Sequence, residues 1–267
     1  MKAEYLTLSY LQLLLASSLM ITNIFLAYLF KLGLIRTYLL AMFRMTLQLG
    51  ILGYLLHWIF SRQNPWEILG LTAVMVIAAS HSSLQRVSWH YKGIFMDSLL
   101  AILFAAYFVT SLTVIGILRL EPWYTPQYLI PLLGMVLGNC LNGISLGLDT
   151  FLIERAEKAD RIEEKLALGA TPWEACSELI RRSMHVGMTP IINSMMVVGL
   201  VSLPGMMTGQ ILAGISPIEA VKYQLVIMFM IAAGTALGTL GILLFAFRHS
   251  FNSYGQVLKN LYSAKKK

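Results

Sequence analysis

The chain has 267 residues, of which 57% are hydrophobic and only 12% are charged. Soluble domains carry roughly a quarter of their residues as Asp, Glu, Lys and Arg, so the composition excludes an ordinary water-soluble domain. The formal net charge is +7, but the basic residues gather between long apolar runs, which indicates membrane orientation rather than a nucleic-acid ligand. The two cysteines, Cys140 and Cys176, fall in different environments and predict no disulfide framework.

Long apolar runs dominate the chain. Their lengths suit transmembrane helices, and the ten-residue alternation of a membrane β-barrel is missing. Because a bilayer offers the backbone no hydrogen-bonding partners, we predict an all-α, polytopic membrane protein with about seven transmembrane helices. The predicted spans are Tyr5–Leu29, Tyr38–Phe60, Trp66–Ala79, Met96–Leu118, Tyr128–Phe151, Met188–Ala213 and Ala220–Phe247. The third is short, which leaves six spans as an alternative, and the first lacks the features of a cleaved signal peptide.

Lys and Arg are divided unequally between the two sets of loops that these spans define. One set holds fifteen of them and the other holds four, with Arg44 inside a span. Cytoplasmic loops of membrane proteins are enriched in Lys and Arg. The distribution predicts a multi-pass protein of the inner (plasma) membrane, with its amino terminus outside and its carboxyl terminus in the cytoplasm. The basic tail Lys265–Lys267 suits contact with anionic membrane lipid.

A polar segment, residues 152–187, lies between the fifth and sixth predicted spans on the cytoplasmic side. Glu154 and Glu157 each precede a basic residue by four positions, the order that stabilises an exposed helix. Gly169 permits a tight turn, and Thr171-Pro172 supplies an N-cap followed by proline at the first position of a second helix. The pattern predicts helix, turn and helix at the membrane surface. Such a segment is either a binding site for a partner protein or a solvated helical hairpin.

Three stretches carry a resemblance to a known family. They are Leu166-Ala-Leu-Gly-Ala-Thr-Pro172, Gly199-Leu-Val-Ser-Leu-Pro-Gly-Met-Met-Thr-Gly-Gln210 and Ala220-Val-Lys-Tyr-Gln224. Over about Ile35–Phe251 the chain resembles the permeases of Fet-type iron-export ABC transporters, a family that includes plant aluminium-tolerance membrane proteins. Glu163-Glu164-Lys165 stands where the coupling loop of ABC permeases carries glutamate-alanine-alanine, and Gly169 is at the matching offset. The end of that loop departs from the family pattern, because Leu179-Ile-Arg-Arg182 replaces isoleucine-x-leucine-proline.

The resemblance implies a single transmembrane permease domain over residues 1–267 that exports iron, with residues 152–187 as its cytoplasmic coupling segment. It also implies an ABC ATPase partner, with two permease copies and two ATPases in the assembly. The chain has no Gly-x4-Gly-Lys-Ser/Thr loop, so we expect no cofactor on this chain, ATP and Mg on the partner subunit, and a transporter subunit rather than an enzyme. The residues expected to couple the chain to the ATPase are Glu163, Glu164, Leu166, Leu168, Gly169, Ala170, Pro172 and Trp173.

Polar and helix-breaking residues within the spans are candidates for the translocation path. Transporters often bind cargo where a helix is broken at membrane depth, so Pro204 is a candidate, although a kinked span end or a short outer loop between the last two helices explains it equally well. Asn139 and Asn142 could line the path or join helices by hydrogen bonds, and Arg44 could act in transport or reach the membrane surface. The candidates are Arg44, Gln48, Asn139, Asn142, Asp149, Glu154, Pro204, Gly205, Met206, Met207 and Gln210.

The sequence does not identify metal ligands. Iron prefers imidazole and carboxylate to thioethers, so packing is the better interpretation of the four methionines around the predicted break, Met195, Met196, Met206 and Met207. The histidines near the cytoplasmic surface, His81, His90 and His185, share no ligand spacing. Glycines four residues apart predict close helix packing at Gly134/Gly138, Gly143/Gly147 and Gly234/Gly238.

Two other functions remain open. An ABC permease for a different solute (a sugar nucleotide, an anion or an organic molecule) would keep the same architecture, and the solute that stimulates the ATPase would distinguish it. A secondary carrier or a membrane scaffold would need no ATPase. Such a protein would be insensitive to changes within Leu166–Trp173.

Overall fold

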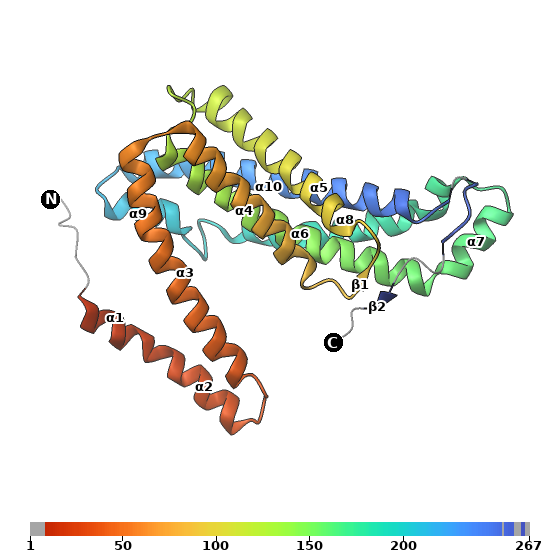
Figure 1. Cartoon of the computed structure of the whole chain (residues 1–267), viewed down its shortest axis with the longest axis horizontal. Helices are drawn as coiled ribbons and strands as arrows, with labels where there is room; N and C mark the ends of the chain where they lie inside the picture. The colour runs from red at the N-terminus through yellow and green to blue at the C-terminus, as the bar shows by residue number, and fades with distance from the viewer. Residues whose placement is uncertain (1–8, 253, 259–262, 265–267) are drawn as a thin grey trace.

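The computed structural model describes residues 9–252, 254–258 and 263–264. Its helices confirm the predicted all-α class, and the sheet within the described residues consists of two-residue strands that pair antiparallel (Figure 1). The elements are α1 (Tyr10–Ser17), α2 (Leu19–Leu29), α3 (Ile35–Arg62), α4 (Pro65–Leu84), β1 (Trp89–His90), α5 (Ile94–Ser111), the π-helix η1 (Leu112–Ile117), α6 (Pro126–Glu157), α7 (Ala159–Ala167), α8 (Pro172–Val197), α9 (Gly205–Leu212), α10 (Pro217–His249) and β2 (Ser263–Ala264).

Within the described residues, six helical stretches are long and apolar enough to cross a membrane. They are α1 with α2, α3, α4, α5 with η1, α6 and α10, and each corresponds to one predicted span. The short third run belongs to a longer helix, because Asn64 caps α4 by accepting a 3.0 Å hydrogen bond from the Trp66 N–H and Pro65 occupies its first turn.

The remaining predicted span, Met188–Ala213, is wrong as a single helix. α8 already begins within the polar segment, at Pro172, and stops at Val197, and the short α9 starts only at Gly205. Gly199 has a φ of +84° in the intervening turn, and Pro204 is the N-cap of α9. A left-handed glycine and a proline without an N–H both oppose a continuous helix, which explains the division.

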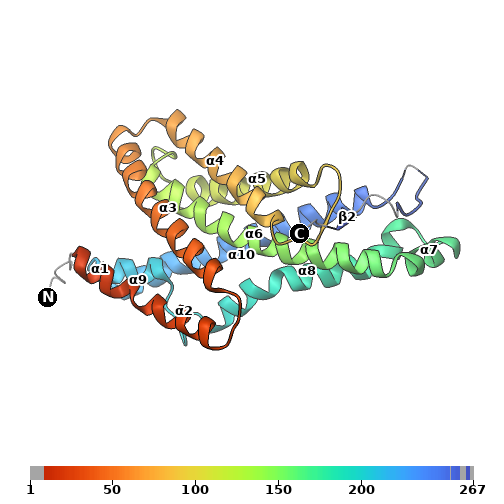
Figure 2. The same ribbon diagram turned by 60° about the horizontal axis from the view of Figure 1, so that its bottom comes forward.

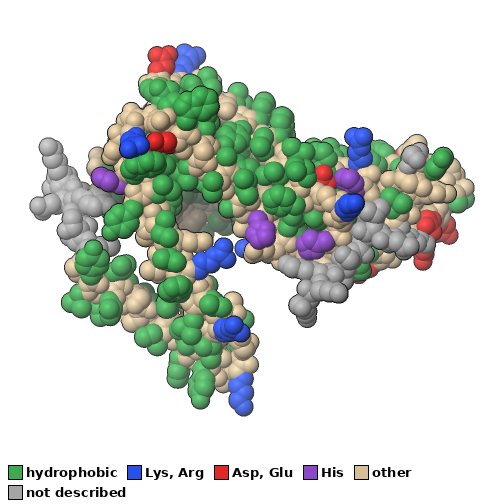
Figure 3. Space-filling model, in the orientation of Figure 1, with side chains coloured by type: hydrophobic (Ala, Val, Ile, Leu, Met, Phe, Trp, Pro, Cys, Tyr) green, Lys and Arg blue, Asp and Glu red, His purple; other side chains and the backbone are tan. Residues whose placement is uncertain are grey.

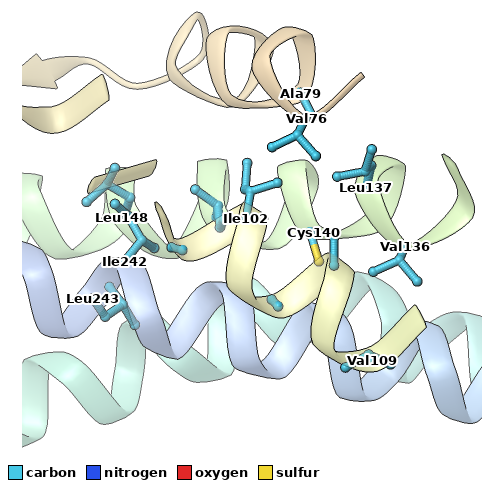
Figure 4. Packing of buried hydrophobic residues seen from close by; sticks show 14 of the residues in the cluster. Val76, Ala79, Ile102, Val109, Val136, Leu137, Cys140, Leu148, Ile242 and Leu243 are labelled. Carbon is cyan, nitrogen blue, oxygen red and sulfur yellow. The ribbon is translucent and has the colours of Figure 1, made fainter. Parts of the chain in front are cut away.

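α6 is the centre of the helix bundle and packs against α4, α5, α8 and α10 (Figures 1 and 2). Fully buried side chains meet along it, including Val76 of α4, Ile102 of α5, Leu148 of α6 and Leu243 of α10 (Figure 4). α10 runs parallel to α6, since Gly234 lies against Val136 near one end and Arg155 reaches Ser250 at the other. α8 runs antiparallel to both, since Gly187 and Ser183 face Gly143 and Gly147 respectively.

Glycines bring α6, α8 and α10 unusually close together. A Cβ on Gly187 would lie 2.8 Å from the Gly143 carbonyl oxygen and 2.7 Å from Thr239 Cγ2. A Cβ on Gly147 would lie 2.8 Å from the same Thr239 methyl group. The predicted close packing at Gly143 and Gly147 is therefore confirmed, and it fixes the position of α8 along α6.

α1, α2 and α3 lean away from the bundle (Figures 1 and 2). Among their described residues, only Ala27 and Ile59 are buried. Hydrophobic side chains cover much of this arm, with a few Lys and Arg side chains among them (Figure 3). An apolar helical surface of this extent suits contact with lipid or with another protein chain.

Candidate translocation cavity and coupling segment

A cavity of about 300 Å³ lies between α6, α8, α9 and α10. It is toward the end of the bundle opposite α7, where α9 packs on α10 (Figures 1 and 2). Small-molecule sites have volumes of roughly 300–1,000 Å³, so the cavity is large enough for a small cargo. The lining side chains are aliphatic, thioether, amide or hydroxyl in type: Met135, Asn139, Ile191, Ser194, Val198, Ser202, Pro204, Gly205, Met206, Gln224, Ile227, Met228 and Ile231.

The break between α8 and α9 forms one wall of this cavity. The last turn of α8 is closed by backbone hydrogen bonds, from the Val198 N–H to the Ser194 oxygen at 3.1 Å and from the Val201 N–H to the Val197 oxygen at 3.0 Å. The start of α9 differs, because no side chain caps it. The acceptor end of α8 is thus satisfied within the chain, whereas the first amides of α9, beginning at Gly205, have no side-chain acceptor.

Two amide side chains are the longest polar groups in the lining. The Asn139 Nδ2 donates a 2.9 Å hydrogen bond to the Met135 carbonyl oxygen of its own helix. Gln224 is only 7% exposed, and its Oε1 is buried without a hydrogen-bond partner. Most buried polar atoms in proteins have partners, so an unpaired amide oxygen on a residue that lines a cavity marks a position where a rearranged side chain can bind a ligand or water.

Four of the predicted path residues, Asn139, Pro204, Gly205 and Met206, line the cavity together. Sequence reasoning missed Gln224, although a glutamine in the first two turns of the last apolar span was a usable signal. Met207 and Gln210 belong to α9 without lining the cavity, and Gln210 Oε1 is buried with no hydrogen-bond partner among the described residues.

Asn142 and Asp149 lie farther along α6 and do not line the cavity. Asn142 Oδ1 accepts a 2.9 Å hydrogen bond from Arg86 Nη1, and Asp149 Oδ1 accepts one of 2.7 Å from the Ser88 N–H. Both side chains therefore join α6 to the connection between α4 and α5.

Arg44 and Gln48 do not line this cavity and lie on the exposed face of α3. They share an open groove with the apolar side chains of the same helix. No group of three or more His, Cys, Asp and Glu side chains in the described part of the chain could hold a metal ion.

The turn between α7 and α8 is built from two successive capping motifs. The Ala170 N–H donates to the Lys165 oxygen and the Gly169 N–H donates to the Leu166 oxygen, both at 3.0 Å, while Gly169 has a φ of +93°. These bonds form a Schellman motif, which requires the left-handed conformation that glycine adopts freely. The predicted helix, turn and helix is confirmed.

A capping box at Thr171 then starts α8. The Glu174 N–H donates to Thr171 Oγ1 at 3.3 Å, and the Thr171 N–H donates to Glu174 Oε2 at 2.8 Å. The backbone hydrogen bond from Thr171, followed by the one from its hydroxyl, holds the pKa of the Glu174 carboxyl below its ordinary value.

The predicted coupling residues differ in exposure. Leu168 is 85% exposed at the turn, and Trp173 is about half exposed. The Trp173 ring packs edge-on against the Phe247 ring, with 5.5 Å between the ring centroids. Leu166 instead packs against the hydrophobic core. Glu164 is exposed, whereas three other predicted coupling residues are partly buried: Glu163, Ala170 and Pro172.

Ion pairs and hydrogen bonds attach the coupling segment to the bundle. Glu154 at the end of α6 pairs with Lys158 and with Arg182 of α8, the latter at 2.8 Å. The neighbouring Arg155 is 2% exposed, and its Nη2 donates at 2.6 Å to the carbonyl oxygen of Leu258, beyond the end of α10. Glu154, a predicted path residue, therefore occupies a structural junction rather than the cavity.

Comparison with known proteins identifies the family. Residues 10–251 match the model of an uncharacterised protein family, UPF0014. The chain belongs to this family. It is 38% identical over 215 residues to a UPF0014 membrane protein of Synechocystis, covering 80% of this chain and 83% of that protein.

Two further relatives confirm the resemblance drawn from the motifs. The probable iron export permease protein FetB of Escherichia coli is 33% identical, over 91% of this chain and 93% of its own. The protein ALUMINUM SENSITIVE 3 of Arabidopsis thaliana is 34% identical, over 72% of this chain and 69% of its own. No solved structure matches. These relatives and the six long apolar helices make the chain a multi-pass membrane protein.

Proposed function

We propose that this chain is the permease subunit of an ABC transporter, which exports iron by using ATP hydrolysis on a separate subunit. One observation carries the coupling part of this proposal. The single helix α8 begins at the capped turn beside Leu168 and ends at the cavity, where Ser194 and Val198 form part of the lining. Its 26 residues span about 39 Å at 1.5 Å per residue, so a single helix connects the turn to the cavity.

The iron cargo is supported by the relative named as an iron export permease, which aligns over nearly the whole of both chains. The chain's own charge distribution supports an orientation with the amino terminus outside and the coupling segment in the cytoplasm. The membrane would be the inner (plasma) membrane.

The proposed mechanism uses the two ends of α8. Leu168 and Trp173 would dock into a surface groove of the ATPase, and closure of the ATPase on ATP would displace the turn. Because Gly187 packs directly on Gly143 and Thr239, a displacement of α8 would also act on α6 and α10 at this contact. Transport then requires that the ATPase and the cargo each favour different positions of α8.

A second copy of the permease would complete the assembly. Among the described residues Arg44 forms no ion pair or side-chain hydrogen bond on the exposed face of α3, and a charged side chain facing lipid costs about 2.5–3.5 kcal/mol at the centre of a spanning helix. Packing of α3 against a second copy would remove Arg44 and Gln48 from lipid. The two-plus-two stoichiometry is therefore part of the proposal.

The experiment is co-purification of the permease with its ATPase, followed by measurement of ATP hydrolysis in lipid. Leu168→Glu should abolish both association and stimulated hydrolysis, because a charge replaces the exposed docking side chain. Leu168→Met retains an apolar side chain of similar volume and should retain both. Equal association of the two variants would contradict docking at this turn.

A further inference from the structure

Two helix ends border the cavity between α6, α8, α9 and α10, and they differ in whether their backbone polar groups have hydrogen-bond partners. On one side, the Ser194 and Val197 carbonyl groups at the end of α8 already accept hydrogen bonds from Val198 and Val201. On the other, α9 begins at Gly205 without a side-chain cap. The first amides of a helix carry the positive end of its dipole, equivalent to roughly half an elementary charge, and they favour an anion.

A second, independent feature of the same cavity is Gln224. Its side chain is more than nine-tenths buried, lines the cavity with Gly205 and Met206, and its Oε1 has no hydrogen-bond partner. A glutamine amide can present its NH2 in place of its oxygen by rotating about its last side-chain bond, and it then donates two hydrogen bonds. The hydroxyl groups of Ser194 and Ser202 are further donors in the lining.

The same lining is poorly suited to a bare iron ion. None of its side chains is a carboxylate, an imidazole or a thiolate, which are the groups that iron prefers. A divalent cation would enter next to the positive end of α9 without a negative charge to compensate for its lost hydration. The neutral donors and the helix N-terminus instead match a carboxylate or phosphate group.

We propose that the cavity binds an oxyanion group, a carboxylate or a phosphate, of a small organic cargo, and that iron leaves in complex with such a molecule. The part of this inference that concerns transport of the bound molecule rests on the proposed function. The amides at the start of α9 and the side chain of Gln224 hold the oxyanion, while Met206, Met228 and Ile231 contact the rest of the molecule.

The test is equilibrium dialysis of the full-length chain in lipid nanodiscs with four separate probes: citrate, glycerol phosphate, ferric citrate and ferrous iron alone. The carboxylate and phosphate probes distinguish the two oxyanion chemistries. Saturable binding of citrate or of glycerol phosphate is expected, with ferric citrate bound if the carboxylate is the recognised group. Binding of neither oxyanion overturns the proposal, whether or not ferrous iron binds.

Two pairs of variants test which groups hold the oxyanion. Gly205→Pro removes one N–H at the first position of α9, where proline is tolerated, and Gly205→Ala keeps that N–H at a site with no neighbour within 4 Å of the added Cβ. Gln224→Leu removes the buried amide, and Gln127→Leu makes the same change at an exposed site outside the cavity.

Hydrogen bonds to a charged group are each strong enough that Gly205→Pro and Gln224→Leu should weaken oxyanion binding by about tenfold or more relative to their controls. Equal binding by Gly205→Pro and Gly205→Ala overturns the proposal. ATPase association through Leu168 is measured on the same variants and should be unchanged. If the wild-type chain does not associate with the ATPase, the proposed function is contradicted instead. Failure of the proposed function and failure of oxyanion binding are therefore distinguishable.

Discussion

Gly187 of α8 lies where three helices meet, and its lack of a side chain decides how closely they pack. Gly187→Ala would place a Cβ 2.8 Å from the Gly143 carbonyl oxygen, a backbone atom that cannot rotate away. We expect a loss of about 1–3 kcal/mol in stability, as for overpacked cores. Thermal unfolding in detergent measures it. The control is Gly138→Ala on α6, where an added Cβ has no neighbour within 4 Å; an equal effect of both changes would contradict the packing explanation.

Glu174 should make the start of α8 sensitive to acid. Its pKa is lowered by the hydrogen bonds from Thr171, so the carboxylate stabilises the cap above the ordinary pKa of 4.5 and loses this effect as the pH falls through its lowered folded value. Hydrogen exchange of the Thr171–Glu174 amides, corrected for intrinsic rates, should therefore lose protection in acid. Glu174→Gln should lack this pH dependence; the same dependence in both proteins would exclude the carboxylate as its cause.

The turn between α7 and α8 is the element whose shape we expect to matter most for coupling. Gly169 has a φ of +93°, which costs a non-glycine residue roughly 1–2 kcal/mol, least for asparagine. Gly169→Val should lower transport-linked ATP hydrolysis severalfold. The thermal stability of the spans should be unchanged, since no neighbouring atom lies within 4 Å of a Cβ added at this position. Gly169→Asn should retain more activity than Gly169→Val. The reverse order would show that left-handed geometry is not the property that matters.

The elements could be predicted where their signals are local. Gly169 and Thr171 each mark a helix end by their own side chain or by its absence, and the structure has ends at these positions. The Asn64 cap of α4 is an equally local signal, but it was not used in the prediction. A break at Pro204 was a candidate, but the end of α8 at Val197 was missed because hydropathy averages over the turn that follows it. A window of that kind measures composition, not the backbone hydrogen bonds that end a helix.

The candidate site was predicted less completely because it depends on how helices align. Asp149 and Glu154 are polar residues near the end of an apolar span, as a path would need, but Ser88 and Arg182 bind them from distant parts of the chain. Gln224 joins the cavity only because α10 packs parallel to α6. That register is set by glycine contacts among three helices, which no single helix displays in its sequence.

At the scale of the whole molecule, the arm formed by α1–α3 should be covered by a second copy. Single cysteines at Met45, Leu49 or Leu52 lie on the face of α3 that carries Arg44, and both native cysteines are buried and should not interfere. Oxidation in membranes should give a disulfide-linked dimer for at least one of these variants. Phe104→Cys on α5, as exposed as Leu49 in the single chain, is the control. Cross-linking at Phe104 alone would place the interface elsewhere.

Iron retained by cells most directly tests whether this chain is a permease driven by a separate ATPase. Cells lacking the protein are loaded with radiolabelled iron and compared with cells that regain the wild-type chain, the Leu168→Glu variant, or the wild-type chain with an ATPase that cannot hydrolyse ATP. We predict a faster loss of cell iron only with the wild-type chain and an active ATPase. The same rate of loss in all four strains would contradict iron export by this protein.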